Sequence, residues 1–209
     1  MKKVGIYISI PKCASKTILD LYQLGKNRDN DKRDKIHPII YENHQRLKIL
    51  EKKYNLSNKF IFTFVRNPYD RIVSWYNYHK NSKKERENKI YREYSLNDWI
   101  EKGCPTHWIK QNQTNWKEEN KTPLLQYNFV EGNTKVDYIG KMEEFEKDNL
   151  KIMEILNEIY KKENIDIKLE YNFIKKNSSN RKEDILTEKS KQIIYKMFKK
   201  DFDEFNYDK

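Results

Sequence analysis

Two short apolar runs stand out along the chain, and a helical pattern follows each of them. Residues 4–10 read VGIYISI and residues 60–65 read FIFTFV, and both runs are rich in strong strand formers. Runs of this kind are typical of strands that are buried on both faces of a parallel sheet. Pro11 ends the first run, Pro68 closely follows the second, and apolar residues then recur at helical spacing. The pattern therefore predicts two strand–turn–helix units.

The rest of the chain carries weaker signals of the same two kinds. Residues 136–140 are predicted as a third strand, and residues 41–54 have the spacing of a helix. Residues 145–162 and 187–205 are predicted as amphipathic helices, and the apolar face of the first is expected to include Leu150. Because buried strands alternate with helices, the sequence predicts an α/β fold, P-loop-like and three-layered, with a mainly parallel central sheet flanked by helices.

The composition indicates a folded protein with anionic partners. A length of 209 residues suits a single domain, which is expected to span residues 1–209. With 15 Tyr, 9 Phe and 4 Trp, the chain is too rich in aromatic residues for a disordered protein. The formal net charge of +11 favours partners such as nucleotides or acidic polysaccharides.

The cysteine count and the lengths of the apolar runs bear on where the protein works. Cys13 and Cys104 are the only cysteines, so the sequence excludes a disulfide framework and a Cys-based zinc site. No apolar run approaches the ~18 residues of a membrane helix, and no signal peptide is recognisable. We therefore expect a cytoplasmic protein without stable membrane insertion, while the sequence leaves its oligomeric state open.

The turn after the first predicted strand has the composition of an anion-binding loop. It reads PKCASKT, and a loop that leads from a strand into a helix presents free backbone N–H groups to a phosphate. Lysines add charge, hydroxyls add donors, and small side chains let the backbone approach the anion. The candidate binding residues are Lys12, Cys13, Ala14, Ser15, Lys16 and Thr17. The alternative, that Lys12 and Lys16 are ordinary surface lysines, stays open on this loop alone.

The turn after the second strand points to a function more specifically than the first loop does. It reads RNPYDRIVSWY, which places Arg66 at the end of the strand and Ser74 inside the following helix. A guanidinium group binds phosphate in a two-pronged way, so Arg66 and Ser74 are expected to hold one phosphate together. Asp70 and Arg71 are expected to act as capping or pairing residues.

These two motifs resemble those of the carbohydrate-type sulfotransferases that use 3′-phosphoadenosine-5′-phosphosulfate (PAPS), in particular their bacterial members. Three further stretches of this chain are similar to parts of the family pattern: residues 136–148, 177–179 and 201–207. The resemblance implies transfer of a sulfuryl group from PAPS, as co-substrate without a metal ion, to an acceptor hydroxyl, expected on a carbohydrate. It also implies that the first loop binds the 5′-phosphosulfate, that Arg66 and Ser74 bind the 3′-phosphate, and that Asn177 and Arg181 reach the nucleotide from a late loop.

The resemblance also implies the catalytic groups. Lys12 is placed to stabilise the charge that grows on the bridging oxygen of PAPS. His44 precedes Arg66 by the interval at which sugar sulfotransferases place a base histidine, so we expect it to be the general base. His37 and His107 stay open as alternatives that line the site, and His79 is expected at the surface.

Two interpretations from other classes remain. Lys16 and Thr17 fit the end of a Walker A loop, which would suit a P-loop nucleotide kinase, but Ile10 and Ser15 stand where that motif has glycines. A kinase also needs a carboxylate for Mg²⁺ at a strand end, where this chain has Arg66. A basic module that binds nucleic acid or acidic glycan would spread its positive charge along a face with interleaved aromatic residues. The informative basic residues lie at strand ends instead, so we expect a nucleotide partner and no nucleic acid.

Overall fold

The computed structural model describes residues 2–22, 24, 38–106, 125–171 and 185–209. Their contacts cluster into two compact units. The first contains residues 1–65 and 129–177, and the second contains residues 66–128 and 178–209. No helix in the described part of the chain is both long and apolar enough to cross a membrane.

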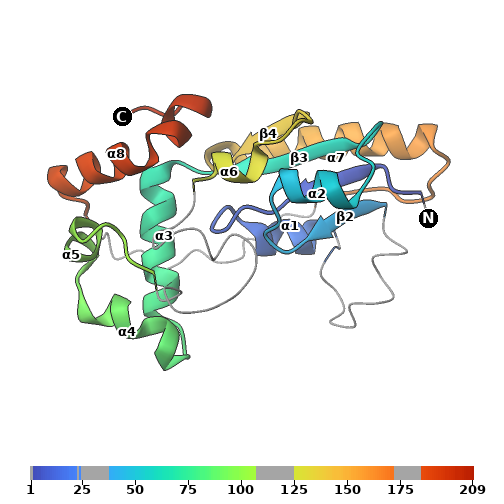
Figure 1. Ribbon diagram of the computed structural model, residues 1–209. Helices are drawn as coiled ribbons and strands as arrows, with labels where there is room; N and C mark the ends of the chain where they lie inside the picture. The colour runs from blue at the N-terminus through green and yellow to red at the C-terminus, as the bar shows by residue number, and fades with distance from the viewer. Residues whose placement is uncertain (1, 23, 25–37, 107–124, 172–184) are drawn as a thin grey trace. The chain divides into compact units, whose positions relative to one another are not determined.

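A four-stranded parallel sheet forms the centre of the first unit (Figure 1). Its strand order is β2-β1-β3-β4, and every neighbouring pair is parallel. In chain order the strands are β1 (Gly5–Ile8), β2 (Ile39–Glu42), β3 (Phe60–Val65) and β4 (Tyr138–Lys141). The register pairs Gly5 with Ile39 on one side and with Phe60 on the other. The prediction of a mainly parallel central sheet is confirmed.

Helices pack on both faces of this sheet. They are α1 (Ser15–Leu21), α2 (Leu47–Lys53) and α7 (Phe145–Lys162), which follows the short 3-10 helix η1 (Met142–Glu144). Figure 1 shows α2 in front of the sheet and α7 behind it. Tyr22, just after α1, packs on Phe62 of β3 with ring centroids 5.5 Å apart, and its hydroxyl donates to Asn149 of α7, so α1 and α7 cover the same face. The three-layer α/β prediction is therefore confirmed.

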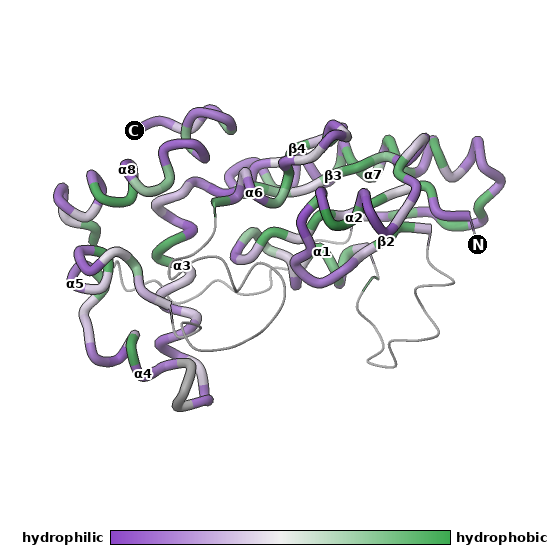
Figure 2. Tube along the Cα trace, viewed as in Figure 1, coloured by the Kyte–Doolittle hydropathy of each residue, from purple (hydrophilic) through white to green (hydrophobic). Residues whose placement is uncertain are grey.

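Close packing between β4 and its neighbour requires a glycine. A Cβ atom at Gly140 would lie 2.6 Å from the ring of Phe64, which in turn packs against Phe145 at the start of α7. Figure 2 shows apolar and polar residues alternating along α7, as an amphipathic helix on a sheet requires. The predicted bounds of this helix agree with the structure. Leu150 was expected on the buried face together with Met153 and is 49% exposed, because the buried face runs through Ile152, Met153 and Leu156.

The second unit is helical. It contains α3 (Pro68–Lys80), α4 (Glu85–Glu93), α5 (Leu96–Glu101) and α8 (Glu188–Glu204), while the short helix α6 (Tyr127–Val130) spans the sequence boundary between the units. Large buried aromatic side chains fill its core, including Trp75, Tyr76, Tyr91, Trp99 and Phe198. The final predicted helix is thus present as α8, with Thr187 as its N-cap.

Two further sequence predictions are wrong. The helix predicted for residues 41–54 begins only at Leu47, because Tyr41 and Glu42 pair with β1 as part of the short strand β2. His79 was expected at the surface and is only 4% exposed. Its ring stacks on Tyr91 with centroids 5.0 Å apart and also packs against Trp75, so His79 belongs to the aromatic core of the second unit.

Candidate active site

The loop between β1 and α1 folds through two residues with left-handed backbone. Lys12 has a φ of 70° and Ala14 a φ of 53°, and α1 begins at the next residue, Ser15. A non-glycine residue in this conformation costs roughly 1–2 kcal/mol, so surrounding contacts must hold the loop. The first N–H groups of any α-helix have no partner within the helix, which gives this turn donors for an anion.

Ser15 supplies one of the contacts that hold the loop. Its hydroxyl donates to the carbonyl oxygen of Ile10 at 3.0 Å and accepts from the hydroxyl of Ser9 at 2.8 Å. The sulfotransferases that this loop resembles have a glycine at the position of Ser15. Here the positive φ values fall at Lys12 and Ala14, so the position of Ser15 does not require glycine.

The remaining loop residues differ in where their side chains lie. Lys16 is exposed, while Lys12 and Thr17 are half-buried. Cys13 is fully buried, its Sγ lies 3.8 Å from the carbonyl oxygen of Pro11, and its N–H donates to the carbonyl of Ile10 at 3.3 Å. The thiol of Cys13 therefore faces the core.

His44 lies in the turn after β2. Because β1 and β2 are parallel neighbours, the turns that follow them leave the sheet at the same edge. The Nδ1 atom of His44 lies 3.0 Å from the carbonyl oxygen of Ser9 and 3.2 Å from the hydroxyl oxygen of the same residue. A carbonyl oxygen only accepts hydrogen bonds, so Nδ1 carries the proton and the neutral ring has its lone pair on Nε2.

These contacts join the histidine to the loop through one hydroxyl group. Ser9 contacts His44 on one side and Ser15 on the other, and Ser9 itself is fully buried. The backbone of His44 is left-handed, with a φ of 55°, a conformation that is uncommon for residues other than glycine and that clusters at functional sites. The first unit therefore holds an imidazole nitrogen with a lone pair beside a candidate anion loop.

The second predicted binding turn begins at Arg66, in the second unit. The Asn67 side chain caps α3 by accepting from the N–H of Tyr69 at 2.9 Å, and Pro68 occupies the first turn of that helix. Arg66 and Ser74 are both half-buried. The side chain of Gln126 bonds both backbone polar groups of Arg66, accepting from its N–H and donating to its carbonyl, each at 2.8 Å.

A family model described as "Sulfotransferase family" matches residues 2–208. The chain belongs to this sulfotransferase family. No curated protein and no solved structure gives a significant match.

Several predicted residues of this sulfotransferase lie outside the described part of the chain. They are His37, His107, Asn177 and Arg181. Within the described ranges, no three His, Cys, Asp or Glu side chains gather in a way that would hold a metal ion.

Sequence reasoning assigned no role to three buried polar residues of the sulfotransferase. Ser9 has a signal that was overlooked, because it is the one serine in the apolar run of residues 4–10. Gln126 has no sequence signal, since its side chain bonds the backbone N–H and carbonyl of Arg66, which are groups that any residue carries. Asp201 begins the late stretch DFDEFNY, and its carboxylate accepts from the N–H groups of Gln126 and Tyr127.

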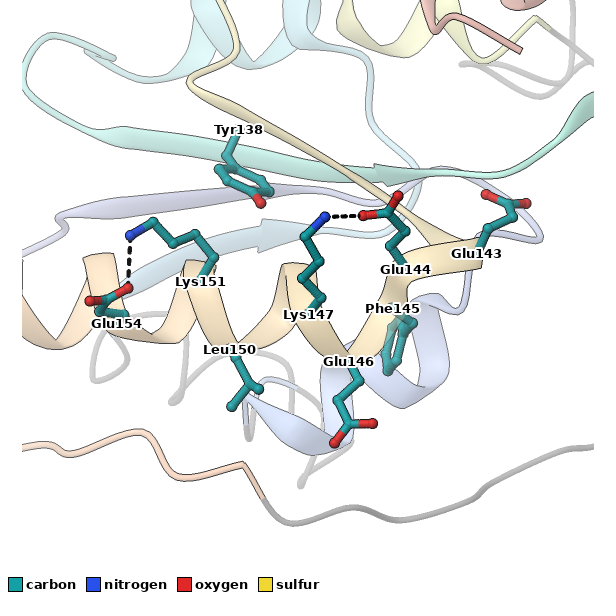
Figure 3. A pocket seen from close by; sticks show the side chains of 9 residues that line it. All are labelled: Tyr138, Glu143, Glu144, Phe145, Glu146, Lys147, Leu150, Lys151 and Glu154. Carbon is teal, nitrogen blue, oxygen red and sulfur yellow. Dashed lines mark hydrogen bonds and ion pairs between the residues drawn. The ribbon is translucent and has the colours of Figure 1, made fainter. Parts of the chain in front are cut away.

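A surface depression of about 970 Å³ lies elsewhere on the sulfotransferase, along η1 and the first turns of α7 (Figure 3). Its charged side chains are partly paired with each other, Lys147 with Glu144 and Lys151 with Glu154. Among the predicted nucleotide-binding and catalytic residues that the structure describes, none lines it. We assign this depression no part in sulfuryl transfer.

Proposed function

We propose that this sulfotransferase moves a sulfuryl group from PAPS to a hydroxyl group of a carbohydrate. The observation that carries the proposal is the set of contacts from His44 through Ser9 to Ser15 in the anion loop. These contacts hold the proposed general base and the proposed PAPS-binding loop together within the first unit. Membership of the sulfotransferase family supports the type of reaction.

In the proposed reaction the acceptor oxygen attacks the sulfur atom of PAPS, in line with the leaving group. The bond between sulfur and the bridging oxygen breaks, and the electron pair leaves with the 5′-phosphate of 3′-phosphoadenosine-5′-phosphate (PAP). Nε2 of His44 takes the proton of the acceptor hydroxyl. Lys12 stabilises the charge on the bridging oxygen, while Lys16, Thr17 and the loop amides, including the backbone N–H of Ser15, bind the non-bridging oxygens.

We assign recognition of the 3′-phosphate to the turn that starts at Arg66. The guanidinium group of Arg66 offers two parallel N–H donors, and the hydroxyl of Ser74 adds a third. Asn177 and Arg181 are proposed to contact the nucleotide as well, on the strength of the resemblance alone. The carbohydrate acceptor rests on the same resemblance.

Calorimetry of nucleotide binding tests the donor part of the proposal. Wild type should bind PAP much more tightly than AMP, which lacks the 3′-phosphate. Arg66→Ala should remove most of this preference, because a lost charge-assisted hydrogen bond costs roughly 1.5–3 kcal/mol. Binding of ATP with Mg²⁺ in place of PAP would instead support the nucleotide kinase alternative.

Incubation with PAPS labelled in its sulfate group tests the acceptor. Saccharides, a tyrosine peptide and a hydroxyl-bearing lipid should be offered separately at equal concentration. Label transferred to a saccharide supports the proposal. Label found on the peptide or the lipid alone would overturn the carbohydrate assignment, while the assignment of PAPS as the sulfuryl donor would still hold.

A further inference from the structure

Gln126 pairs with the backbone of Arg66 as a neighbouring strand would. Its Oε1 accepts from the N–H of Arg66 and its Nε2 donates to the carbonyl of the same residue, both at 2.8 Å. Arg66 directly follows β3, at the point where the chain leaves the sheet. The amide of Gln126 is fully buried and satisfies both polar groups of the Arg66 backbone.

Asp201 holds Gln126 in turn. Its two carboxylate oxygens accept from the backbone N–H groups of Gln126 at 2.8 Å and of Tyr127 at 2.9 Å. Nη1 of Arg71, in α3, lies 4.0 Å from the same carboxylate, and both side chains are almost completely buried. A buried carboxylate is tolerated only with such partners, so Asp201 joins α8, the Gln126 segment and α3.

We infer that Gln126 is a positioning residue for Arg66 and that Asp201 fixes Gln126 through its backbone. The inference rests on the proposed function, in which Arg66 binds the 3′-phosphate. The φ and ψ angles of Arg66 decide where its side chain points, and the Gln126 amide restrains them by bonding the groups on either side of the Arg66 Cα atom. Loss of this restraint weakens recognition of the 3′-phosphate without removing any group that touches the nucleotide.

The test compares PAP and AMP binding in wild type and Gln126→Ala. We expect the ratio of the two affinities to fall by about tenfold, the effect of losing roughly 1.4 kcal/mol, while AMP affinity changes by less than about twofold. Hydrogen exchange at the Arg66 N–H gives a readout without nucleotide, and this amide should exchange about tenfold faster or more. If Gln126→Ala fails to fold, Gln126→Met takes its place, because methionine keeps the length of the side chain without either hydrogen-bonding group, and it should show the same two changes.

Two controls separate positioning from general destabilisation. Gln192→Ala changes an exposed glutamine of α8 and should leave both readouts unchanged. Ile194→Ala opens the core of the same unit and should lower the melting temperature while keeping the PAP-to-AMP ratio. The inference is overturned if Gln126→Ala behaves like Ile194→Ala, and it is equally overturned if the Arg66 amide exchanges at the wild-type rate. Failure of the proposed function shows differently, because wild type itself would then bind PAP and AMP alike.

Discussion

The Nδ1 atom of His44 lies 3.0 Å from the carbonyl oxygen of Ser9, a backbone acceptor that no side-chain substitution removes. The hydroxyl oxygen of Ser9 lies 3.2 Å from the same nitrogen. The carbonyl selects the tautomer with its lone pair on Nε2, and the hydroxyl adds a second restraint on the ring. The two contacts are separable by mutation, so their contributions can be measured one at a time.

His44→Ala should lower kcat by about 10²–10⁴-fold, the range expected for loss of a general base. PAP affinity should stay within about twofold of wild type, since the loop of residues 11–17 keeps its own contacts. Added imidazole should restore part of the lost rate by entering the space of the missing ring. A variant with nearly full kcat would exclude His44 as the base and direct attention to His37 and His107.

Ser9→Ala should have a smaller effect than His44→Ala. The carbonyl of Ser9 still accepts from Nδ1, so the tautomer is kept, while the hydroxyl bonds to His44 and Ser15 are lost. A hydrogen bond contributes about 1 kcal/mol, so kcat should fall by roughly 5–10-fold. Steady-state kinetics at saturating PAPS measure this, and a fall as large as that of His44→Ala would mean that the hydroxyl, and not the carbonyl, sets the tautomer.

The strands that could be predicted from the sequence are those with continuous apolar runs, as in residues 60–65. β2 was missed because it is only four residues long and is followed closely by the helical spacing of Leu47 and Leu50. Pairing with β1 stabilises it, and this long-range contact leaves no local pattern. Gln126 was missed for a related reason. Its side chain bonds the backbone groups of Arg66, and because every residue carries such groups, no sequence motif marks the pair.

Tyr22→Phe should destabilise the first unit. The Tyr22 hydroxyl donates to Oδ1 of Asn149 at 3.0 Å, and both residues are fully buried. The substitution leaves a buried acceptor on α7 without this donor, which costs about 1–3 kcal/mol of unfolding free energy. Urea unfolding measures the loss. Tyr78→Phe is the matched control, because Tyr78 is 60% exposed and its replacement should change stability by less than about 0.5 kcal/mol.

Neither cysteine should react with a thiol reagent in the folded protein at pH 8. Cys13 and Cys104 are both fully buried, and burial raises the pKa of Cys104 to about 12. Only about one part in 10⁴ of the Cys104 thiol is then ionised at pH 8, and the thiolate is the reactive form. Titration with a coloured disulfide reagent should detect two thiols in denaturant and none before unfolding. Rapid reaction of either thiol in the native protein would contradict this burial.

The same raised pKa of Cys104 gives a dependence of stability on pH. An unfolded thiol ionises near its ordinary pKa of about 8.5, whereas the folded one stays neutral until about pH 12. The unfolded state therefore loses its proton first, and the free energy of unfolding should fall as the pH rises through this window. Urea unfolding of wild type and Cys104→Ala at pH 7.5 and 10 measures this fall. The free energy of unfolding of the variant should depend less on pH than that of wild type. Equal pH dependence in the two proteins would argue against the raised pKa.

The chain of contacts from Arg66 through Gln126 to Asp201 has a consequence for protein synthesis. Gln126 follows Arg66 by 60 residues and Asp201 follows Gln126 by a further 75, so a ribosome makes the three partners at widely separated times. The β1 strand and its anion loop can fold early, but the restraint on the Arg66 backbone is complete only after α8 has emerged. A nascent or truncated chain that lacks Asp201 would present Arg66 without its anchor, so recognition of the 3′-phosphate would be one of the last properties that the growing polypeptide acquires.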